Sequence, residues 1–157
     1  MRNAIFLALL LAALVYALRR GGGPEKAMAW IAALMVASDW LLHLAVPPEF
    51  ASLDVGHLAI DLFGASATFL LAMVAHRFWP LPMAALHFLP LLAHSSRAVD
   101  VAMHPVAYLT MQVASSWPVP LLLILATWRH QRRMRRAGSE PSWYRSWLPS
   151  RPTMPSA

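Results

Sequence analysis

The stretch "AMAWIAALMVASDWLLHLAV", residues 27–46, decides the fold class of this protein. About 20 apolar residues in succession are enough for a helix to cross the hydrocarbon core of a bilayer. Asp39 and His43 are the only ionisable residues in this run. Because lipid offers the backbone no hydrogen-bond partners, such a segment must be helical. The stretch therefore predicts a transmembrane helix that carries an acid and a base.

The composition of the whole chain agrees with this prediction. The 157 residues are 59% hydrophobic and only 13% charged, and the mean hydropathy is +0.51. These values are typical of a membrane protein rather than of a soluble domain. The chain has no cysteine, which excludes disulfides, iron–sulfur clusters and thiolate metal sites. Any binding site must lie between membrane helices, because little of the chain is left to form a separate soluble domain.

Five apolar segments are predicted to span the membrane. They cover residues 3–18, 27–46, 56–75, 81–99 and 105–128. The fifth contains "SSWPVP" at residues 115–120, whose prolines must kink or break the helix, and a kink is expected. The sequence thus predicts an all-α fold, a polytopic membrane helical bundle of residues 1–136 with five transmembrane helices. Residues 137–157, rich in Pro and Ser, are expected to lack fixed structure.

The positions of Lys and Arg predict the orientation of the bundle. The connections "RRGGGPEK" (19–26) and "HRFWP" (76–80) contain bases, as does the exit "TWRHQRRMRR" (127–136), whereas "PPEFASLDV" (47–55) contains none. Basic loops stay in the cytoplasm, so the N-terminus is expected outside and the C-terminus inside. An alternative is that "VYA" at residues 15–17 is a signal-peptidase site. Cleavage there would leave four spans and place the arginine-rich exit outside, against the charge rule.

Several ionisable residues fall at similar depths below the predicted outer surface. A rise of 1.5 Å per residue places Asp39 about 10 Å below that surface, and Asp61 and His94 about 7 to 8 Å. Residues four apart share a helix face, which pairs Asp39 with His43 and His57 with Asp61. Because a charge within lipid is costly, these groups are expected to face the bundle interior and to contact one another. This polar layer comprises Asp39, His43, His57, Asp61, His94 and Arg97.

Three interpretations of the polar layer stay open at this point. Its members could form hydrogen bonds between helices that fix the packing, without any chemistry. They could instead bind a metal ion or haem, since imidazole and carboxylate are suitable ligands, although no spacing here is diagnostic. The candidate ligands are His43, His57, His87 and His94. The third interpretation is a ligand pocket or a proton path that opens outward.

The arginines after the fifth segment are predicted to bind lipid. They are Arg129, Arg132, Arg133, Arg135 and Arg136. We expect them to continue the last helix into the headgroup region, where each base attracts anionic lipid of the cytoplasmic face. The formal charge of +6 would suggest nucleic acid in a soluble protein. Here the bases flank apolar segments, so no nucleic-acid partner is expected.

The chain contains no phosphate-binding glycine loop, nucleophile elbow or zincin motif, so an enzyme is not expected. The "RFWP" turn at 77–80, the histidine-bearing segment 81–99 and "TWRHQRR" at 127–133 resemble a group of small, uncharacterised alphaproteobacterial multi-pass membrane proteins. The resemblance covers about residues 78–136, and it implies a bacterial inner-membrane location but no activity.

The sequence thus predicts a non-catalytic accessory or assembly subunit, as a homo-oligomer or in a larger membrane complex. The alternatives are a haem- or metal-binding redox subunit and part of a small oligomeric transporter. No cofactor is predicted outside the haem or metal alternative.

Overall fold

The computed structural model describes residues 2–45, 54–99 and 104–138, and these form six α-helices and no strand. The helices are α1 (Arg2–Arg20), α2 (Gly23–Ala45), α3 (Val55–Val74), α4 (Pro80–Val99), α5 (Pro105–Ala114) and α6 (Pro118–Ala137). The predicted all-α class is confirmed for this part of the chain. Three segments, Asn3–Arg20, Gly23–Leu44 and Val55–Val74, are long and apolar enough to cross a membrane.

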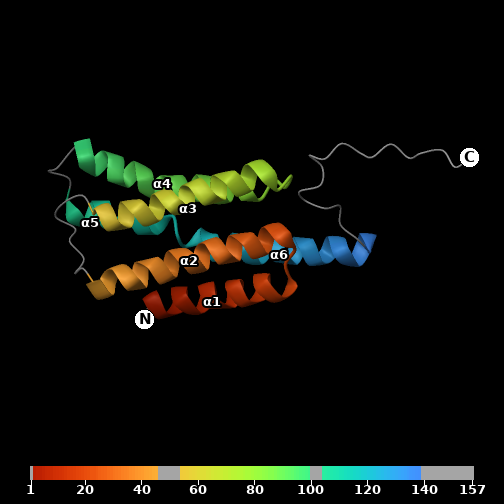
Figure 1. Cartoon of the computed structure of the whole chain (residues 1–157). Coiled ribbons are helices and arrows are strands. Elements are labelled where there is room, and N and C mark those ends of the chain that lie inside the picture. The colour runs from red at the N-terminus through yellow and green to blue at the C-terminus, as the bar shows by residue number, and fades with distance from the viewer. Residues whose placement is uncertain (1, 46–53, 100–103, 139–157) are drawn as a thin grey trace, which may run out of the picture.

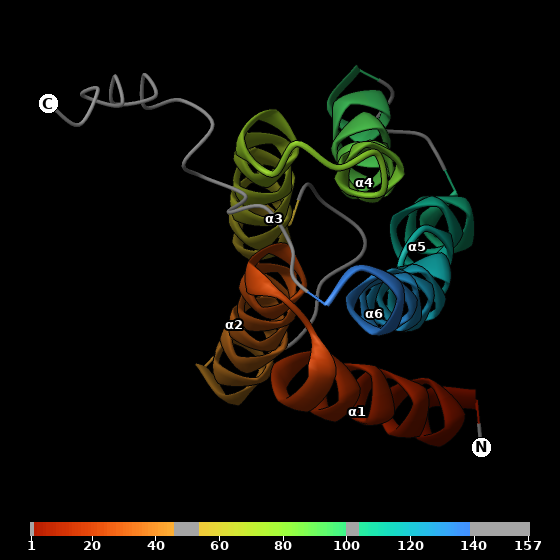
Figure 2. The same ribbon diagram turned by 90° about the vertical axis from the view of Figure 1, so that its right-hand side faces the viewer.

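The helices lie side by side along one axis and form a bundle (Figure 1). Each helix from α1 to α4 packs against the next helix along the chain, and α6 packs against α1, α2 and α4 (Figure 2). We call one end of the bundle the histidine end; there α2 and α4 finish and α3 and α5 begin. The other end, the arginine end, contains the α1–α2 turn, the α3–α4 turn and the finish of α6.

The fifth predicted segment differs from the expected kinked helix, because it is broken into α5 and α6 by a turn at residues 115–117. Pro118 has no N–H to continue the hydrogen-bond ladder, and it occupies the first position of α6, where proline is favoured. The backbone N–H and the hydroxyl of Ser116 both donate to the carbonyl of Val113, at 3.0 and 2.6 Å. With 10 residues, α5 spans only about 15 Å, half of a hydrocarbon core.

The interior of the bundle combines an apolar core, rich in alanine, with several buried polar side chains. Alanines such as Ala13, Ala29 and Ala75 are completely buried in the apolar core, which lets the helix backbones approach closely. The buried polar residues are Glu25, Thr68, His87, His94, Arg97, Ser115, Thr127 and His130. Many large apolar side chains, among them Trp30 and Leu70, are exposed, although others such as Met83 and Leu123 are buried. An apolar exterior with the polar groups placed inside is what a bundle immersed in lipid requires.

The third helix packs closely against its neighbours through a glycine. A Cβ added at Gly64 would come within 2.5 Å of the Met35 side chain in α2 and 3.2 Å of the His87 ring in α4. Thr68, one turn along the same face, is buried, and its hydroxyl donates to the Gly64 carbonyl at 2.7 Å. This small-residue face therefore makes contacts inside the chain.

The last helix extends well beyond the apolar part of the fifth predicted segment. α6 continues to Ala137, so all five of its arginines are helical. It ends at Gly138, whose φ of 69° is a left-handed cap conformation that glycine adopts without strain. The segment predicted to lack structure lies, from residue 139, outside the described residues.

Candidate functional site

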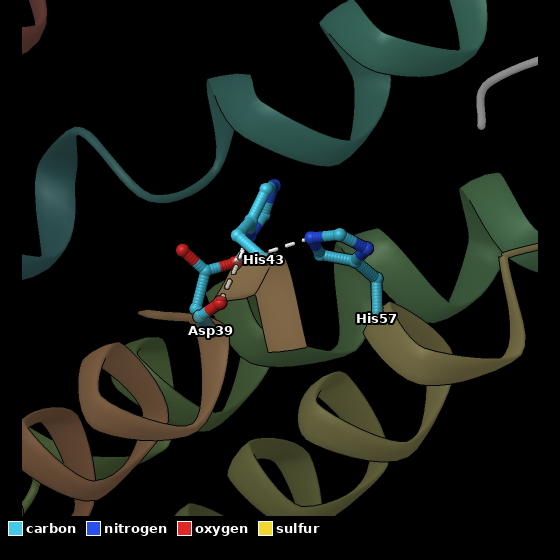
Figure 3. A group of neighbouring side chains, drawn as sticks. All are labelled: Asp39, His43 and His57. Atoms are coloured by element: carbon cyan, nitrogen blue, oxygen red, sulfur yellow. Dashed lines mark hydrogen bonds and ion pairs between the residues drawn. The ribbon is translucent and has the colours of Figure 1, made fainter. Parts of the chain in front are cut away.

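Three residues of the polar layer gather at the histidine end. Asp39 and His43 lie one turn apart near the end of α2, and His57 lies in the first turn of α3 (Figure 3). His57 Nε2 is 3.1 Å from Asp39 Oδ1, and His43 Nδ1 is 3.6 Å from the same oxygen. One potential ligand atom from each residue lies within 4.8 Å of the other two. The adjacent ends of two antiparallel helices thus bring two imidazoles and one carboxylate together.

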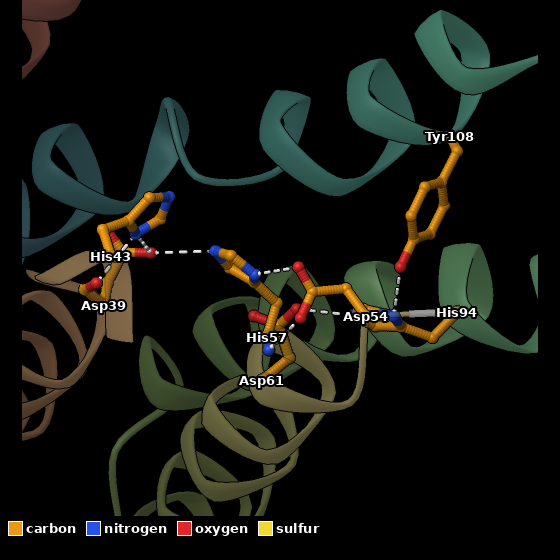
Figure 4. Close-up of polar contacts among 7 residues, drawn as sticks. All are labelled: Asp39, His43, Asp54, His57, Asp61, His94 and Tyr108. Atoms are coloured by element: carbon orange, nitrogen blue, oxygen red, sulfur yellow. Dashed lines mark hydrogen bonds and ion pairs between the residues drawn. The ribbon is translucent and has the colours of Figure 1, made fainter. Parts of the chain in front are cut away.

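His57 stands between two carboxylates (Figure 4). Its Nδ1–H donates to Asp54 Oδ2 at 2.5 Å, while its Nε2 faces Asp39 at 3.1 Å. Ionised carboxylates only accept hydrogen bonds, so Asp54 fixes the proton on Nδ1. The lone pair of a neutral ring would then face the oxygen of Asp39. Either a second proton on the ring or a cation shared with Asp39 must relieve that contact.

Asp54 holds His57 by two bonds, because it is also the N-cap of α3. Its Oδ1 accepts the backbone N–H of His57 at 3.0 Å. Burial alone would raise the pKa of Asp54, but the hydrogen bonds from the backbone N–H and the ring of His57 outweigh it, so the pKa lies below its usual value. Asp54 is therefore a carboxylate at neutral pH. A histidine oriented in this way by a carboxylate is a recurring arrangement around protein-bound metals.

The three groups lie close enough for one metal ion after His43 turns. Ligand atoms that bind a tetrahedral zinc at about 2.0–2.1 Å lie about 3.3 Å from one another. His57 Nε2 and Asp39 Oδ1, 3.1 Å apart, are close to that value, whereas His43 Nδ1, 3.6 Å from the same oxygen, donates to a backbone carbonyl. Two histidines and one carboxylate are a donor set used by zinc and by non-haem iron sites. Haem does not fit between these histidines, since their rings meet edge to face with centres 5.1 Å apart.

His43 is the most adjustable of the three groups. Its Nδ1–H donates to the backbone carbonyl of Asp39 at 2.8 Å, and its side chain is 39% exposed. This tautomer leaves Nε2 unprotonated. An exposed ring can turn to present either nitrogen, so completing a metal site requires only side-chain rotation.

A second polar group links three helices beside this cluster. His94 of α4 donates from Nε2 to Asp61 Oδ2 of α3 at 3.0 Å, and the Tyr108 hydroxyl of α5 donates to His94 Nδ1 at 2.6 Å (Figure 4). Both ring nitrogens of His94 thus bond protein groups, which suits a structural link rather than a metal ligand. Arg97 is buried on the next turn and lies over the Tyr108 ring, 5.9 Å from its centre.

The polar layer therefore divides into two groups rather than forming one site. Asp39, His43 and His57 form the first, while Asp61, His94 and Arg97 belong to the second. The spacing rule paired His57 with Asp61, but His57 turns instead to Asp39 and Asp54. His87, the fourth candidate ligand, lies apart in the core, where its Nδ1–H donates to the Met83 carbonyl at 2.9 Å.

A cavity adjoins the first group and also reaches Asp61 of the second group. Its volume is about 430 Å³, and its wall includes Asp39, His43, His57 and Asp61. Residues of α1 and α5, among them Phe6 and Val113, complete the wall. A small cation entering at the histidine end would reach Asp39 and the two imidazoles first.

Three residues that the sequence did not single out make important contacts in the structure. Asp54 was only a charge in a loop, and Tyr108 stood in an apolar segment. Glu25 was only a loop charge as well, yet it is buried, accepts the Gly22 N–H at 3.1 Å, and lies 4.0 Å from an Arg133 nitrogen. A capping acid just before an apolar run was the available indication for Asp54 and Glu25.

Comparisons with protein-family models, curated proteins and solved structures find no match to this chain.

Proposed function

We propose that this protein is a non-catalytic accessory subunit of the bacterial inner membrane that binds one divalent transition-metal ion at its outer, histidine end. The ligands are Asp39, His43 and His57, and Asp54 orients His57. The observation that carries the proposal is the position of His57, whose Nδ1 bonds one carboxylate while its Nε2 faces another at 3.1 Å. A metal ion between Nε2 and Asp39 satisfies both groups without a second proton on the ring.

The proposal includes five membrane crossings, of which α1, α2 and α3 supply three. The fourth is α4, whose average hydropathy is lowered by buried polar residues that include His87, His94 and Arg97. Its outward side chains, such as Phe88 and Leu92, are apolar. The fifth crossing is made jointly by α5 and the first half of α6, since α5 alone is too short.

The orientation, with the histidine end outside, is supported by the distribution of charge. Arg19, Arg20 and Lys26 lie near the α1–α2 turn, Arg77 near the α3–α4 turn, and the arginines of α6 in its second half. All of these positions belong to the arginine end of the bundle (Figure 1). Arg2 and Arg97 lie toward the histidine end, so the arginine end carries the excess of bases rather than all of them, and that excess favours the arginine end in the cytoplasm.

The metal proposal is tested on the full chain, purified in mild detergent and stripped with chelator. After equilibrium dialysis against Zn²⁺, we expect about one ion per chain, and we expect His57→Ala to abolish binding. The matched control is His104→Asn at the same end, because His104 caps α5 and asparagine preserves a capping acceptor. Metal content that is equal in His57→Ala and the unaltered protein, or absent from both, would reject the proposal.

The orientation has a separate test. A reporter fused to the C-terminus that is active only in the cytoplasm should be active in cells. Activity of a periplasm-specific reporter at that position would place the arginine end outside and overturn the outward location of the metal site.

A further inference from the structure

The arginine end of the bundle contains a large cleft that the metal proposal does not use. It has a volume of about 780 Å³ and lies between the α3–α4 turn and the second half of α6. The view down the axis shows α6 facing the pair formed by α3 and α4 (Figure 2). Clefts of this size accommodate a small ligand or a lipid headgroup.

Five arginines line this cleft. Four of them, Arg129, Arg132, Arg133 and Arg136, come from one face of α6, with the spacing of three and four residues that aligns side chains along a helix. Arg77 approaches from the α3–α4 turn. The turn is set by His76, whose φ of 44° is a left-handed conformation uncommon for a residue with a side chain.

The charge of the cleft is strongly positive. Within the described part of the chain, none of the residues that line it is acidic, and nearby Glu25 comes within ion-pair distance of Arg133, at 4.0 Å. Guanidinium groups brought together in a concave site repel one another, and an anion bound between them lowers that repulsion. Their planar, forked donors match the oxygens of phosphate, which they bind in pairs.

The rest of the cleft wall is apolar and aromatic. The Trp128 ring lies under Arg132, 4.7 Å from its guanidinium carbon, and is 45% exposed. Phe78, on the turn side, is 81% exposed. Exposed aromatic rings beside arginines, at the point where the proposed fifth crossing ends, are typical of the lipid headgroup region. Leu125 continues the wall toward the apolar part of α6, in the direction that an acyl chain would follow.

We infer that this cleft binds the phosphate group of an anionic phospholipid, held between Arg77 and the arginine face of α6. The inference differs from general attraction of a basic surface to lipid, because it assigns binding to the arginines of the cleft. The sequence predicted lipid binding for Arg135 as well, but Arg135 does not line the cleft, although it lies on α6 among the others and is exposed, as are Arg129, Arg132 and Arg136. It therefore provides a matched control within the same helix.

The test measures binding of fluorescent phosphatidylglycerol to the full chain in detergent micelles, with fluorescent phosphatidylcholine as the zwitterionic reference. We expect Arg77→Gln to weaken phosphatidylglycerol binding about tenfold, the size of one lost charge-assisted contact. Arg135→Gln should stay within about twofold of the unaltered protein, because Arg135 does not line the cleft and contributes only a screened attraction. Arg132→Lys keeps the charge but removes the paired N–H donors of the guanidinium group, so it should also weaken phosphatidylglycerol binding. With this second variant, the test does not depend on Arg77→Gln folding correctly.

Two results would overturn the inference. Equal losses in Arg77→Gln and Arg135→Gln would show a diffuse basic surface instead of a site. Complete displacement of the fluorescent lipid by millimolar inorganic phosphate or glycerol phosphate would show that the cleft takes soluble phosphate compounds and does not need the lipid. Neither result bears on metal binding at the opposite end, so the two proposals can fail separately.

Discussion

Replacing Asp54 by asparagine tests the role of this residue without removing its cap. Asn and Asp are equally good N-cap residues, so the side-chain oxygen of the introduced asparagine can still accept the His57 backbone N–H. The NH₂ group of that asparagine would then face His57 Nδ1, where the second oxygen of Asp54 now lies 2.5 Å away. A donor in that position makes Nδ1 an acceptor and moves the ring proton to Nε2.

The expected effect on metal binding follows from this change of tautomer. A protonated Nε2 cannot bind a metal, so binding requires the ring to lose its new hydrogen bond or to turn. Loss of an orienting second partner typically weakens metal affinity by about 10- to 100-fold. At 25 °C this is about 1.4 to 2.7 kcal/mol of binding free energy. Asp54→Asn should therefore bind Zn²⁺ more weakly by an amount in that range. In the absence of metal it should lose less stability than Asp54→Ala, because it keeps the cap and loses only the charge.

The companion variant separates capping from metal binding. Asp54→Ala removes both functions, so it should lower the free energy of unfolding by about 1 kcal/mol as well as the metal affinity. Affinity is measured by competition with a chromophoric chelator, and stability by thermal unfolding in detergent after metal removal. If Asp54→Asn bound Zn²⁺ as tightly as the unaltered protein, the proposed role of Asp54 in orienting His57 would be refuted.

Four further predictions concern particular contacts. His94→Ala should lower the stability by about 1–3 kcal/mol, because it leaves two largely buried polar partners unpaired, yet keep Zn²⁺ binding; an unchanged melting temperature would contradict the link between helices. Gly64→Ala should destabilise the bundle by about 1–3 kcal/mol by crowding α2 and α4, and a stabilised variant would show that the packing there is loose. Glu25→Ala should lower the free energy of unfolding by about 1 kcal/mol more than Glu25→Gln does, because glutamine keeps an acceptor for the Gly22 N–H; equal unfolding temperatures of the two variants would argue against that hydrogen bond. Because the pKa of Asp54 is lowered, its contribution to stability is present above the usual carboxyl pKa and is lost as the pH falls through the acid range. The difference in free energy of unfolding between the unaltered protein and Asp54→Ala, measured at several pH values, should therefore shrink in the acid range; a constant difference would contradict this.

The fold class and the helix order along the chain could be predicted because they depend on local pattern. Apolar runs of membrane length and the prolines and glycines between them mark where most helices begin and end. The break before Pro118 was harder, because prolines in an apolar run are compatible with either a kink or a turn. Whether the helix kinks or breaks depends on whether Ser116 can donate a hydrogen bond to the Val113 carbonyl, and that depends on local geometry.

The candidate site was predictable only where its residues share a helix. The four-residue spacing of Asp39 and His43 identifies them as neighbours, and their contact follows. The position of His57 between Asp39 and Asp54 depends on how α2 and α3 are placed in space, which one sequence does not specify. The same holds for Arg77, whose approach to α6 depends on the order of the helices around the bundle.

The most direct test of the metal site is a titration of the chelator-treated full chain with Co²⁺, followed by visible absorption. Cobalt bound by two imidazoles and a carboxylate in a site with few ligands gives strong visible bands, unlike hydrated cobalt. We predict that these bands appear, saturate near one equivalent per chain and are lost in His57→Ala. A spectrum that remains that of hydrated cobalt throughout the titration would contradict the metal proposal and leave His57 as a charged bridge between Asp39 and Asp54.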